Sequence, residues 1–534
     1  MFTPIQLSYG ALSIITVASL VFISFLLPRD KAEKNELWNK LDNVGVPSGI
    51  LPWTRAVFHS ITALRQNTHD GYKKFIKLDR PFAIPTIWTG KAIVVVPPSA
   101  LHLTNRPDSE LIGFWALVEN IQLPYFIPDR DVIENVIHFE VSRKDLTKRN
   151  VSRQLEPMAE EIKHCFETLW GDSKEWKTVN GWDMSGQIIA RVALRTLLGS
   201  PACRNEELVE ATQLFANSLF AAAAVINCLP PLLRPIIGPI LALKTKKYRA
   251  QYRKIVVPLI EERIRLWEQH KKTGEPAELP SDFVQWIIPR AAQHGPEHLD
   301  PSKISYRLLA LNTMFVFAMS YIFAHCVIDI CASPERKRFM DGIAAECKTV
   351  LAKYPEGLAS GEAVEQLHRA DSAIRESMRV SDVGALSLPR DVVGKKPLDL
   401  GNGIILPLGT RLMYPSQAMH MDPDYWPEPA RFDAFRFSDP FDPEVAGSGG
   451  KNEDGTVKER EGLVELTPTF LAWGYGKKAC PGRWYAGQTI KQALAHMVMK
   501  YDVELVGEPP KRKALLNMMV PPTDVKLRFR RRAD

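Results

Sequence analysis

The sequence predicts a helix-rich α+β domain that follows a single membrane-spanning helix. The first 28 residues carry no charged side chain, and apolar residues recur at helical spacing between residues 105 and 380. Short segments rich in β-branched residues and broken by proline lie on both sides of that helical region. A composition of 45% hydrophobic and 24% charged residues is typical of a folded chain and excludes a disordered one.

Residues 1–28 predict a membrane anchor. Residues 11–27 (ALSIITVASLVFISFLL) are mostly apolar, and extension back to Ile5 gives about the twenty residues that a bilayer core requires. Basic residues follow from Arg29 onwards and none precedes, so the positive-inside rule places the rest of the chain in the cytosol. A secretory signal peptide is the main alternative, but it normally starts with a basic segment that this chain lacks.

Residues 29–55 predict a linker, in which Pro47, Gly49 and Pro52 disfavour a helix, and residues 56–534 predict the folded body. Apolar residues at i, i+3 and i+4 predict four helices of this body, over Thr147–Glu167, Trp182–Leu198, Glu206–Ile226 and Lys246–Trp267. The four prolines between positions 230 and 239 predict a loop between the last two of these helices.

Residues 304–331 predict one long apolar helix. It has no Lys, Arg, Asp or Glu from Leu308 to Ile328, so a second membrane span is one interpretation. Asn312 and Ser320 interrupt the apolar stretch, and the flanking segments have the composition of a soluble protein. We therefore expect the central buried helix of the body.

Strands are predicted at both ends of the body. Residues 82–98 are rich in β-branched side chains and broken by proline, which indicates short strands. Residues 447–454 (GSGGKNED) predict a flexible loop. The tail at 525–531 (VKLRFRR) alternates apolar and polar residues and predicts an edge strand.

Charge and cysteine content exclude several classes of protein. A formal net charge of +7 is small for 534 residues and no long Lys/Arg run accompanies it, so a nucleic-acid partner is not expected. Seven cysteines are too few for a disulfide scaffold, and no Cys-x-x-Cys pair occurs. This cysteine usage is typical of a reducing compartment.

The segment 473–483 (WGYGKKACPGR) carries the clearest chemical signal. Glycines near Cys480 permit a sharp backbone path and the close approach of a flat ligand. Residues 484–500 are strongly helix-forming, so the sulfur lies at a helix N-terminus, where backbone N–H groups favour a thiolate. Such a thiolate is either a nucleophile or an axial metal ligand. A nucleophile normally needs a histidine base, and none lies nearby in the sequence.

This segment resembles the haem-binding loop of the cytochromes P450, F-x-x-G-x-R-x-C-x-G. Gly476, Cys480 and Gly482 match that pattern, whereas Trp473 stands in place of Phe and Lys478 in place of Arg or His. Trp473 keeps an aromatic wall beside the sulfur. Lys478 keeps a cation that can pair with a haem propionate.

Two further segments resemble the same family and occur in the family's order. Glu376 and Arg379 match its E-x-x-R, whose i,i+3 spacing places both groups on one helical face. Residues 432–437 (FDAFRF) resemble the segment that supplies Arg436 to a Glu–Arg–Arg cluster. The resemblance covers residues 40–530 and is strongest for fungal microsomal, ent-kaurene-oxidase-like members.

The resemblance implies a cytochrome P450 fold for the catalytic domain at 56–534, helix-rich with small β-sheets. It also implies a haem b ligated by the Cys480 thiolate, which favours O–O cleavage. The family's W-x-x-x-R is absent, which leaves Arg143 and Lys144 as candidates for the propionates, with His138 beside them.

The implied partners are an NADPH-cytochrome P450 reductase and the endoplasmic reticulum membrane, with the catalytic domain in the cytosol. Basic residues near the cysteine offer either a docking face for the reductase or an ordinary solvated surface: Lys477, Lys478, Arg483 and Lys491.

The long helix departs from the family's oxygen-activating motif, A/G-G-x-D/E-T-T or A-I-H-T-T. Phe317 takes the position of the acid or His, and Ala318 and Met319 take those of the two threonines. The hydroxyl that relays protons is therefore missing. Tyr321 lies one turn from Ala318 on a similar face and is a candidate proton donor, beside water or a substrate hydroxyl.

Two interpretations follow from this departure. In the first, the protein is a monooxygenase that obtains its protons elsewhere. In the second, it catalyses a redox-neutral rearrangement, cyclisation or dehydration. Apolar residues of the long helix, with those at 383–389 and 516–521, indicate a lipophilic substrate, and the resemblance suggests a terpenoid or polyketide-like secondary metabolite.

Overall fold

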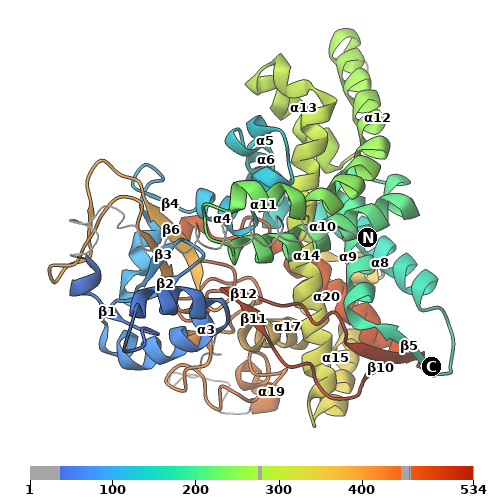
Figure 1. The fold of residues 1–534 in the computed structure, drawn as a ribbon. Coiled ribbons are helices and arrows are strands. Elements are labelled where there is room, and N and C mark those ends of the chain that lie inside the picture. Colours follow the sequence, from blue (N-terminus) through green and yellow to red (C-terminus); the bar gives the residue numbers. More distant parts are fainter. Residues whose placement is uncertain (1–36, 275–279, 447–455, 457–458, 533–534) are drawn as a thin grey trace, which may run out of the picture.

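The computed structural model describes residues 37–274, 280–446, 456 and 459–532. The predicted membrane anchor at 1–28 and the predicted loop at 447–454 lie outside the described residues. Figure 1 shows a helix-rich part beside a smaller part that contains most of the strands. The helix-rich α+β class is therefore confirmed for the described chain.

The long apolar helix is α14 (Pro301–Ala332), and it lies at the centre of the helical part (Figure 1). It packs against α9 (Gly181–Leu198), α10 (Glu206–Asn227), α17 (His368–Val380) and α20 (Arg483–Lys500). By length and composition α10 and α14 could each cross a membrane, but 78% of the α14 window is buried inside the protein. The expected central buried helix is thus confirmed.

The four helices predicted from periodicity are present with small changes of boundary. Thr147–Glu167 is divided into α7 (Lys148–Val151) and α8 (Leu155–Leu169), and Lys246–Trp267 lies inside the longer α12 (Leu243–Thr273). The other helices are α3 (Pro52–Lys74), α4 (Phe114–Asn120), α5 (Arg130–Glu134), α6 (Ile137–Asp145), α13 (Phe283–His294), α15 (Arg336–Leu351), α16 (Gly361–Glu365), α18 (Ser416–His420) and α19 (Pro443–Ala446).

The prediction of a continuous loop around Pro230–Pro239 is wrong in one respect. A further helix, α11 (Arg234–Leu241), forms inside this segment. Pro235 occupies its first turn, where the missing N–H would have no helical partner in any case.

The main sheet has six strands in the order β1-β2-β3-β9-β6-β4. Its strands are β1 (Asp42–Asn43), β2 (Phe82–Thr86), β3 (Lys91–Val95), β9 (Arg411–Tyr414), β6 (Ser387–Val392) and β4 (Leu111–Ile112). The strands predicted within 82–98 are β2 and β3, which pair antiparallel from Phe82 with Val95 to Thr86 with Lys91. Helix α3 packs on β2 and covers this sheet.

The C-terminal strand is not an edge strand, so that prediction is wrong. Strand β13 (Lys526–Arg531) lies between β10 (Tyr501–Val506) and β5 (Lys177–Asn180) in a three-stranded sheet. The alternation of the tail does reflect one buried face, because Leu527 and Phe529 are both buried. Alternation, however, says nothing about how many neighbours a strand has. Two short hairpins complete the strands: β7 (Leu398–Asp399) with β8 (Ile405–Leu406), and β11 (Ala514–Leu515) with β12 (Met518–Met519).

The predicted linker at 29–55 belongs to the folded body in its described part. Leu37 and Leu41 are buried, and β1 pairs in parallel with β2 through Asp42 and Phe82. Helix α3 already begins at Pro52. Pro47 and Gly49 thus precede α3 within the described body, and Pro52 is its first residue.

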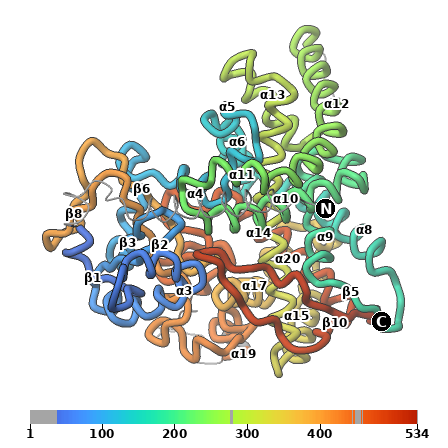
Figure 2. Tube along the Cα trace, viewed as in Figure 1, coloured from blue at the N-terminus to red at the C-terminus, as the bar shows by residue number. Residues whose placement is uncertain are grey.

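The C-terminal part returns to the N-terminal part of the described chain. In Figure 2 the red segment before β13 passes beside the blue helix α3. The backbone N–H of Leu516 donates to the carbonyl of Ile61 at 2.8 Å, which fixes the β11–β12 hairpin against α3.

Candidate active site

The cysteine segment forms a tight loop directly before α20. The N–H of Cys480 donates to the carbonyl of Trp473 at 2.8 Å and closes the loop. Gly474 and Gly476 both have positive φ, +80° and +63°, which glycine adopts without strain. The side chain of Asn105 accepts the N–H of Lys477 at 3.0 Å and holds the outer side of the loop. The indole of Trp473 is buried and donates to the carbonyl of Leu463.

Cys480 differs from the other cysteines in its surroundings. Five of the seven cysteines are buried and Cys228 is half-buried, whereas Cys480 is an exposed residue. A β-carbon on Gly482 would lie 3.7 Å from the ring of Phe315 and 4.0 Å from the sulfur of Cys480. The absence of that carbon leaves the sulfur and α14 facing each other. Surrounding protein raises the pKa of the Cys480 thiol, while the backbone N–H groups of Gly482 and Arg483 act in the opposite direction.

The face of α14 that adjoins the cysteine is partly open and apolar. Met314, Phe315 and Ala318 are half-buried, whereas Val316 and Met319 between and beyond them are buried. Residues 314, 315 and 318 share one side of a helix because they are separated by one, three and four positions. Ala318 therefore presents a methyl group and no hydroxyl, about one turn from Phe315, whose ring adjoins the cysteine loop.

The neighbours of Ala318 on α14 point elsewhere. The ring of Phe317 stacks on Phe220 of α10 at 3.6 Å and meets the edge of Trp182 of α9. Tyr321 is buried, and its hydroxyl donates to the backbone carbonyl of Asp382 at 3.3 Å. Burial also raises the pKa of this phenol. The structure thus does not bring the Tyr321 hydroxyl to the open face.

Glu376, Arg379 and Arg436 meet in a buried cluster. Arg379 of α17 donates two hydrogen bonds to the carboxylate of Glu376, each of 2.8 Å, and Arg436 donates a third of 3.0 Å. The side chains of Glu376 and Arg379 have no exposed surface, and that of Arg436 is 14% exposed. Remaining donors of the two arginines bond carbonyls of the segment 420–431, for example Arg379 to His420 at 2.6 Å.

The cluster is connected to the cysteine loop through residues that the sequence analysis missed. The imidazole of His420 accepts the N–H of Leu471 at 3.0 Å and stacks on Phe470. Arg375 of α17 lies over the ring of Phe470 at 4.0 Å and donates to the carbonyl of Gly462. Arg375 stands beside Glu376 in the sequence, but an arginine on a helix carries no local signal that it will be buried.

The basic residues that the sequence proposes for the propionates have different surroundings. Lys478 pairs with Asp108 at 2.7 Å. Arg143 and Lys144 are exposed in the last turn of α6, while His138 on the same helix is buried, which lowers its pKa to about 3. Lys491 cannot belong to a docking face because it is buried and pairs with Asp371 at 2.6 Å.

Comparison with known proteins identifies the family of this chain. The family model described as cytochrome P450 matches residues 134–529. The chain belongs to the cytochrome P450 family. The protein is therefore a haem enzyme whose iron is ligated by a thiolate.

Three fungal relatives cover most of this cytochrome P450. The cytochrome P450 monooxygenase gloP of Glarea lozoyensis is 31% identical, over 98% of this chain and 96% of its own length. The monooxygenase okaG of Penicillium ochrochloron is 31% identical over 90% of this chain and 91% of its own length. The monooxygenase htyF of Aspergillus rugulosus is 30% identical over 93% of this chain and 73% of its own length. The chain is accordingly an enzyme with monooxygenase activity.

The residues present fit a haem. Cys480 is the exposed cysteine among the described residues, and it offers the sulfur that the family's iron requires. A β-carbon on Gly482 would contact both the sulfur and the ring of Phe315, so its absence removes one obstacle to a flat group beside the sulfur. Cys480 is thus the candidate iron ligand in the described part of the chain.

Proposed function

We propose that this cytochrome P450 uses Cys480 as its axial haem ligand and oxidises a lipophilic secondary metabolite, terpenoid or polyketide-like in nature. The observation that carries the proposal is the exposed residue Cys480, whose sulfur adjoins the half-buried apolar face of α14. The apolar side chains on that face favour a substrate with little polar surface. The fungal relatives, each called a monooxygenase, support the reaction class.

The haem would supply dioxygen activation, and the side chains of this chain would position and shield it. Cys480 would hold the iron, and Trp473 would pack beside its sulfur. Gly476 and Gly482 would allow the haem to approach the loop backbone closely. Lys478, Arg143 and Lys144 remain the proposed propionate partners. Phe315 and Ala318 would exclude water from the haem and orient an apolar substrate.

The proton supply would differ from the common arrangement because Ala318 has no hydroxyl. Tyr321 already donates to Asp382 and is shielded by its neighbours. Water or a hydroxyl of the substrate is therefore the better-placed proton source. The relatives give no support to the alternative of a redox-neutral rearrangement, cyclisation or dehydration.

Electrons would come from NADPH through a cytochrome P450 reductase on the same membrane. We propose that residues 1–28 anchor the protein in the endoplasmic reticulum membrane as a single span, with the body in the cytosol. The uncharged segment followed by basic residues supports this arrangement. Lys491 is buried and paired with Asp371, so it is not available to the reductase. Lys477 and Arg483 remain the proposed docking residues.

Replacement of the cysteine tests the site. Cys480→Ser should fold but lose the carbon-monoxide difference spectrum of a haem thiolate. Cys228→Ser, at a half-buried cysteine, is the matched control and should keep that spectrum. A thiolate spectrum that persists in Cys480→Ser would overturn the assignment.

Metabolite analysis tests the reaction. In the native host, loss of this gene should cause accumulation of a compound that lacks one oxygen atom, or has two additional hydrogen atoms, relative to the normal product. An isomer of the product would contradict an oxidation. In the reconstituted enzyme, Ala318→Thr should raise the ratio of product formed to NADPH consumed. An unchanged ratio would show that a hydroxyl at this position has no part in the proton supply.

A further inference from the structure

A buried histidine and a buried carboxylate lie side by side behind the cysteine loop. His420 is the last residue of α18, and its side chain has no exposed surface. Its Nδ1 lies 3.2 Å from a carboxylate oxygen of Asp382, whose side chain is 5% exposed. Neither of these two atoms has a hydrogen-bond partner elsewhere among the described residues. Because buried polar atoms are rarely left unpaired, each of the two is the partner of the other.

The second ring nitrogen of His420 shows which tautomer the imidazole adopts. The backbone N–H of Leu471 donates to Nε2 of His420 at 3.0 Å. A ring nitrogen that accepts a hydrogen bond carries no proton. The imidazole is therefore neutral, and its proton lies on Nδ1, on the side of Asp382.

Leu471 lies at the base of the cysteine loop. Its carbonyl accepts the N–H of Gly474 at 2.9 Å, and the carbonyl of Trp473 accepts the N–H of Cys480 at 2.8 Å. Leu471 is buried, so its own N–H has no water to bond if the imidazole offers a proton instead of a lone pair. The tautomer of His420 therefore bears on the backbone from which the loop begins.

The position of Asp382 is fixed from two sides. The hydroxyl of Tyr321, on the central helix α14, donates to the backbone carbonyl of Asp382 at 3.3 Å. Arg512 donates to the carbonyl of Val380 and to the hydroxyl of Ser381, the two residues directly before Asp382. The carboxylate is thus held at its place without a hydrogen bond to its own oxygen atoms from these neighbours.

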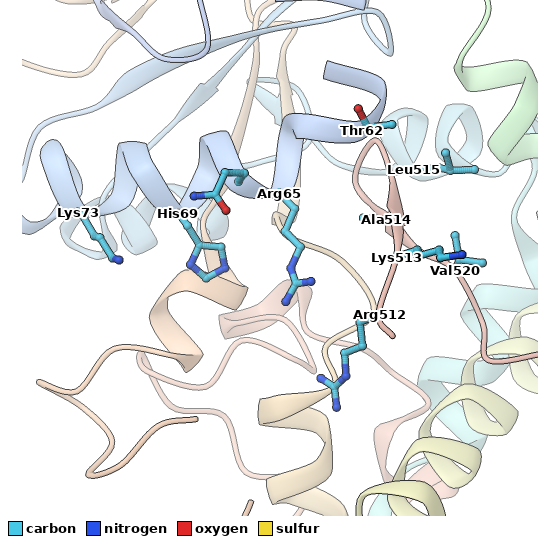
Figure 3. A pocket seen from close by; sticks show the side chains of 10 residues that line it. Thr62, Arg65, His69, Lys73, Arg512, Lys513, Ala514, Leu515 and Val520 are labelled. Atoms are coloured by element: carbon cyan, nitrogen blue, oxygen red, sulfur yellow. The ribbon is translucent and has the colours of Figure 1, made fainter. Parts of the chain in front are cut away.

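The position of His420 is fixed as well. Arg379 donates to its backbone carbonyl at 2.6 Å. Arg65 of α3 donates at 2.8 Å to Gln417, which belongs to the same helix as His420. Arg65 and Arg512 line one pocket of about 820 Å³ between α3 and β11 (Figure 3), so the segments of both partners are attached to the walls of this pocket.

We propose that Asp382 is a positioning residue: it keeps the proton of His420 on Nδ1, so that the free Nε2 holds Leu471 and thereby the cysteine loop. A carboxylate stabilises the N–H group that faces it. In the other tautomer, two N–H groups would face each other between His420 and Leu471. The inference rests on the proposed function in one respect, since the loop matters because it would present Cys480 to the haem.

Two substitutions of His420 test the role of Nε2. A glutamine side chain can place its amide oxygen near the position of Nε2, whereas asparagine is one bond shorter and reaches only the position of Nδ1. Hydrogen exchange at the amide of Leu471, measured by mass spectrometry on the full-length holoenzyme in non-ionic detergent, should be about tenfold faster in His420→Asn. It should change little in His420→Gln.

Replacement of Asp382 tests its action through His420. Asp382→Leu has a similar size and no acceptor, so exchange at Leu471 should again be about tenfold faster. In the double variant Asp382→Leu/His420→Gln this loss should disappear, because glutamine accepts the N–H of Leu471 without help from Asp382. Glu161→Gln is the control, since it alters a buried carboxylate of α8 that pairs with Arg204, and it should leave this exchange unchanged.

The tautomer itself can be observed by NMR of ¹⁵N-labelled histidine in the diamagnetic ferrous carbon-monoxide form. The signal of His420, assigned by its loss in His420→Gln, should show a protonated Nδ1 in the wild type and a protonated Nε2 in Asp382→Leu. A merely structural role of Asp382 would not change which nitrogen carries the proton.

Three results would overturn the proposal. They are a protonated Nε2 in the wild type, a proton that stays on Nδ1 in Asp382→Leu, and equal exchange at Leu471 in the asparagine and glutamine variants of His420. None of them depends on the iron ligand. Persistence of the thiolate spectrum in Cys480→Ser would instead refute the proposed function and leave the exchange and NMR results intact, so the two failures are distinguishable.

Discussion

At the scale of single residues, Gly476 shows how closely the cysteine loop is confined. Its φ of +63° is strained for any other residue, and a β-carbon there would collide with the side-chain oxygen of Asn105. Gly403 has a similar φ of +74° but nothing within 4 Å of its β-carbon position. A comparison of Gly476 with Gly403 therefore distinguishes the cost of backbone strain from the cost of the collision with Asn105.

Gly476→Ala should lower the free energy of unfolding by about 1–3 kcal/mol, more than Gly403→Ala, because only Gly476 adds a collision to the backbone strain. Urea unfolding of the two variants measures the difference. The haem content after purification should fall in Gly476→Ala alone. Equal stability losses would show that the loop moves away from Asn105 without cost.

Arg379 tests the buried Glu–Arg–Arg cluster. Arg379→Ala should lower the free energy of unfolding by roughly 3–5 kcal/mol, because it leaves the carboxylate of Glu376 buried with half of its partners lost. Arg431→Ala is the matched control, since this exposed arginine makes its ion pairs at the surface and should change little. Similar unfolding curves for the two variants would contradict a structural role of the cluster.

At the scale of elements, α17 is held at its start by a carboxylate from another helix. Glu346 of α15 accepts the backbone N–H groups of Arg369 and Ala370, in the first turn of α17. This helix carries Arg375, Glu376 and Arg379, so its entry point influences the whole cluster. Burial raises the pKa of Glu346 from its usual 4.5 to about 7.

The raised pKa of Glu346 predicts a pH dependence of stability. The folded protein binds this proton more tightly than the unfolded chain does. The resulting contribution to the free energy of unfolding is therefore full below pH 4.5 and is lost as pH rises through 7. Between these values the free energy of unfolding should fall by up to about 3 kcal/mol more in the wild type than in Glu346→Gln. Urea unfolding at several pH values measures this difference, and identical pH profiles would contradict the assignment.

Elements also mark where prediction from sequence ends. The apolar period of α14 and of α9 is local, and both helices were predictable from it. The two neighbours of β13 come from residues 177–180 and 501–506, so no local pattern could reveal that it is a central strand. The meeting of Glu376, Arg379 and Arg436 could be predicted because the family resemblance implies contacts between distant segments. Periodicity carries no such information.

At the scale of the whole molecule, the described body has its own cores. Two large clusters of buried residues, one around α14 and one around the six-stranded sheet, contain residues from Leu37 to Phe529. A chain that lacks residues 1–28 retains every member of both clusters. The body should therefore fold without the proposed anchor.

Deletion of residues 1–28 should give a protein that keeps the haem-thiolate spectrum and moves from the membrane pellet to the supernatant. Centrifugation followed by spectroscopy checks both outcomes, with the full-length chain as control. A truncated protein that remains in the pellet as folded holoenzyme would indicate that the body itself binds the membrane. Loss of the spectrum would contradict an independent body.

The sequence by itself determined the helix-rich class, the central buried helix, the cysteine loop and the missing hydroxyl at Ala318. These features depend on local periodicity or on residues that stand close together. Only the tertiary structure decided that Tyr321 donates to Asp382, that Lys491 is buried against Asp371, and that α3 forms a cationic pocket with the segment 512–515. A side chain's partner and its exposure are set by segments far away in the chain, because folding brings such segments into contact and excludes water between them.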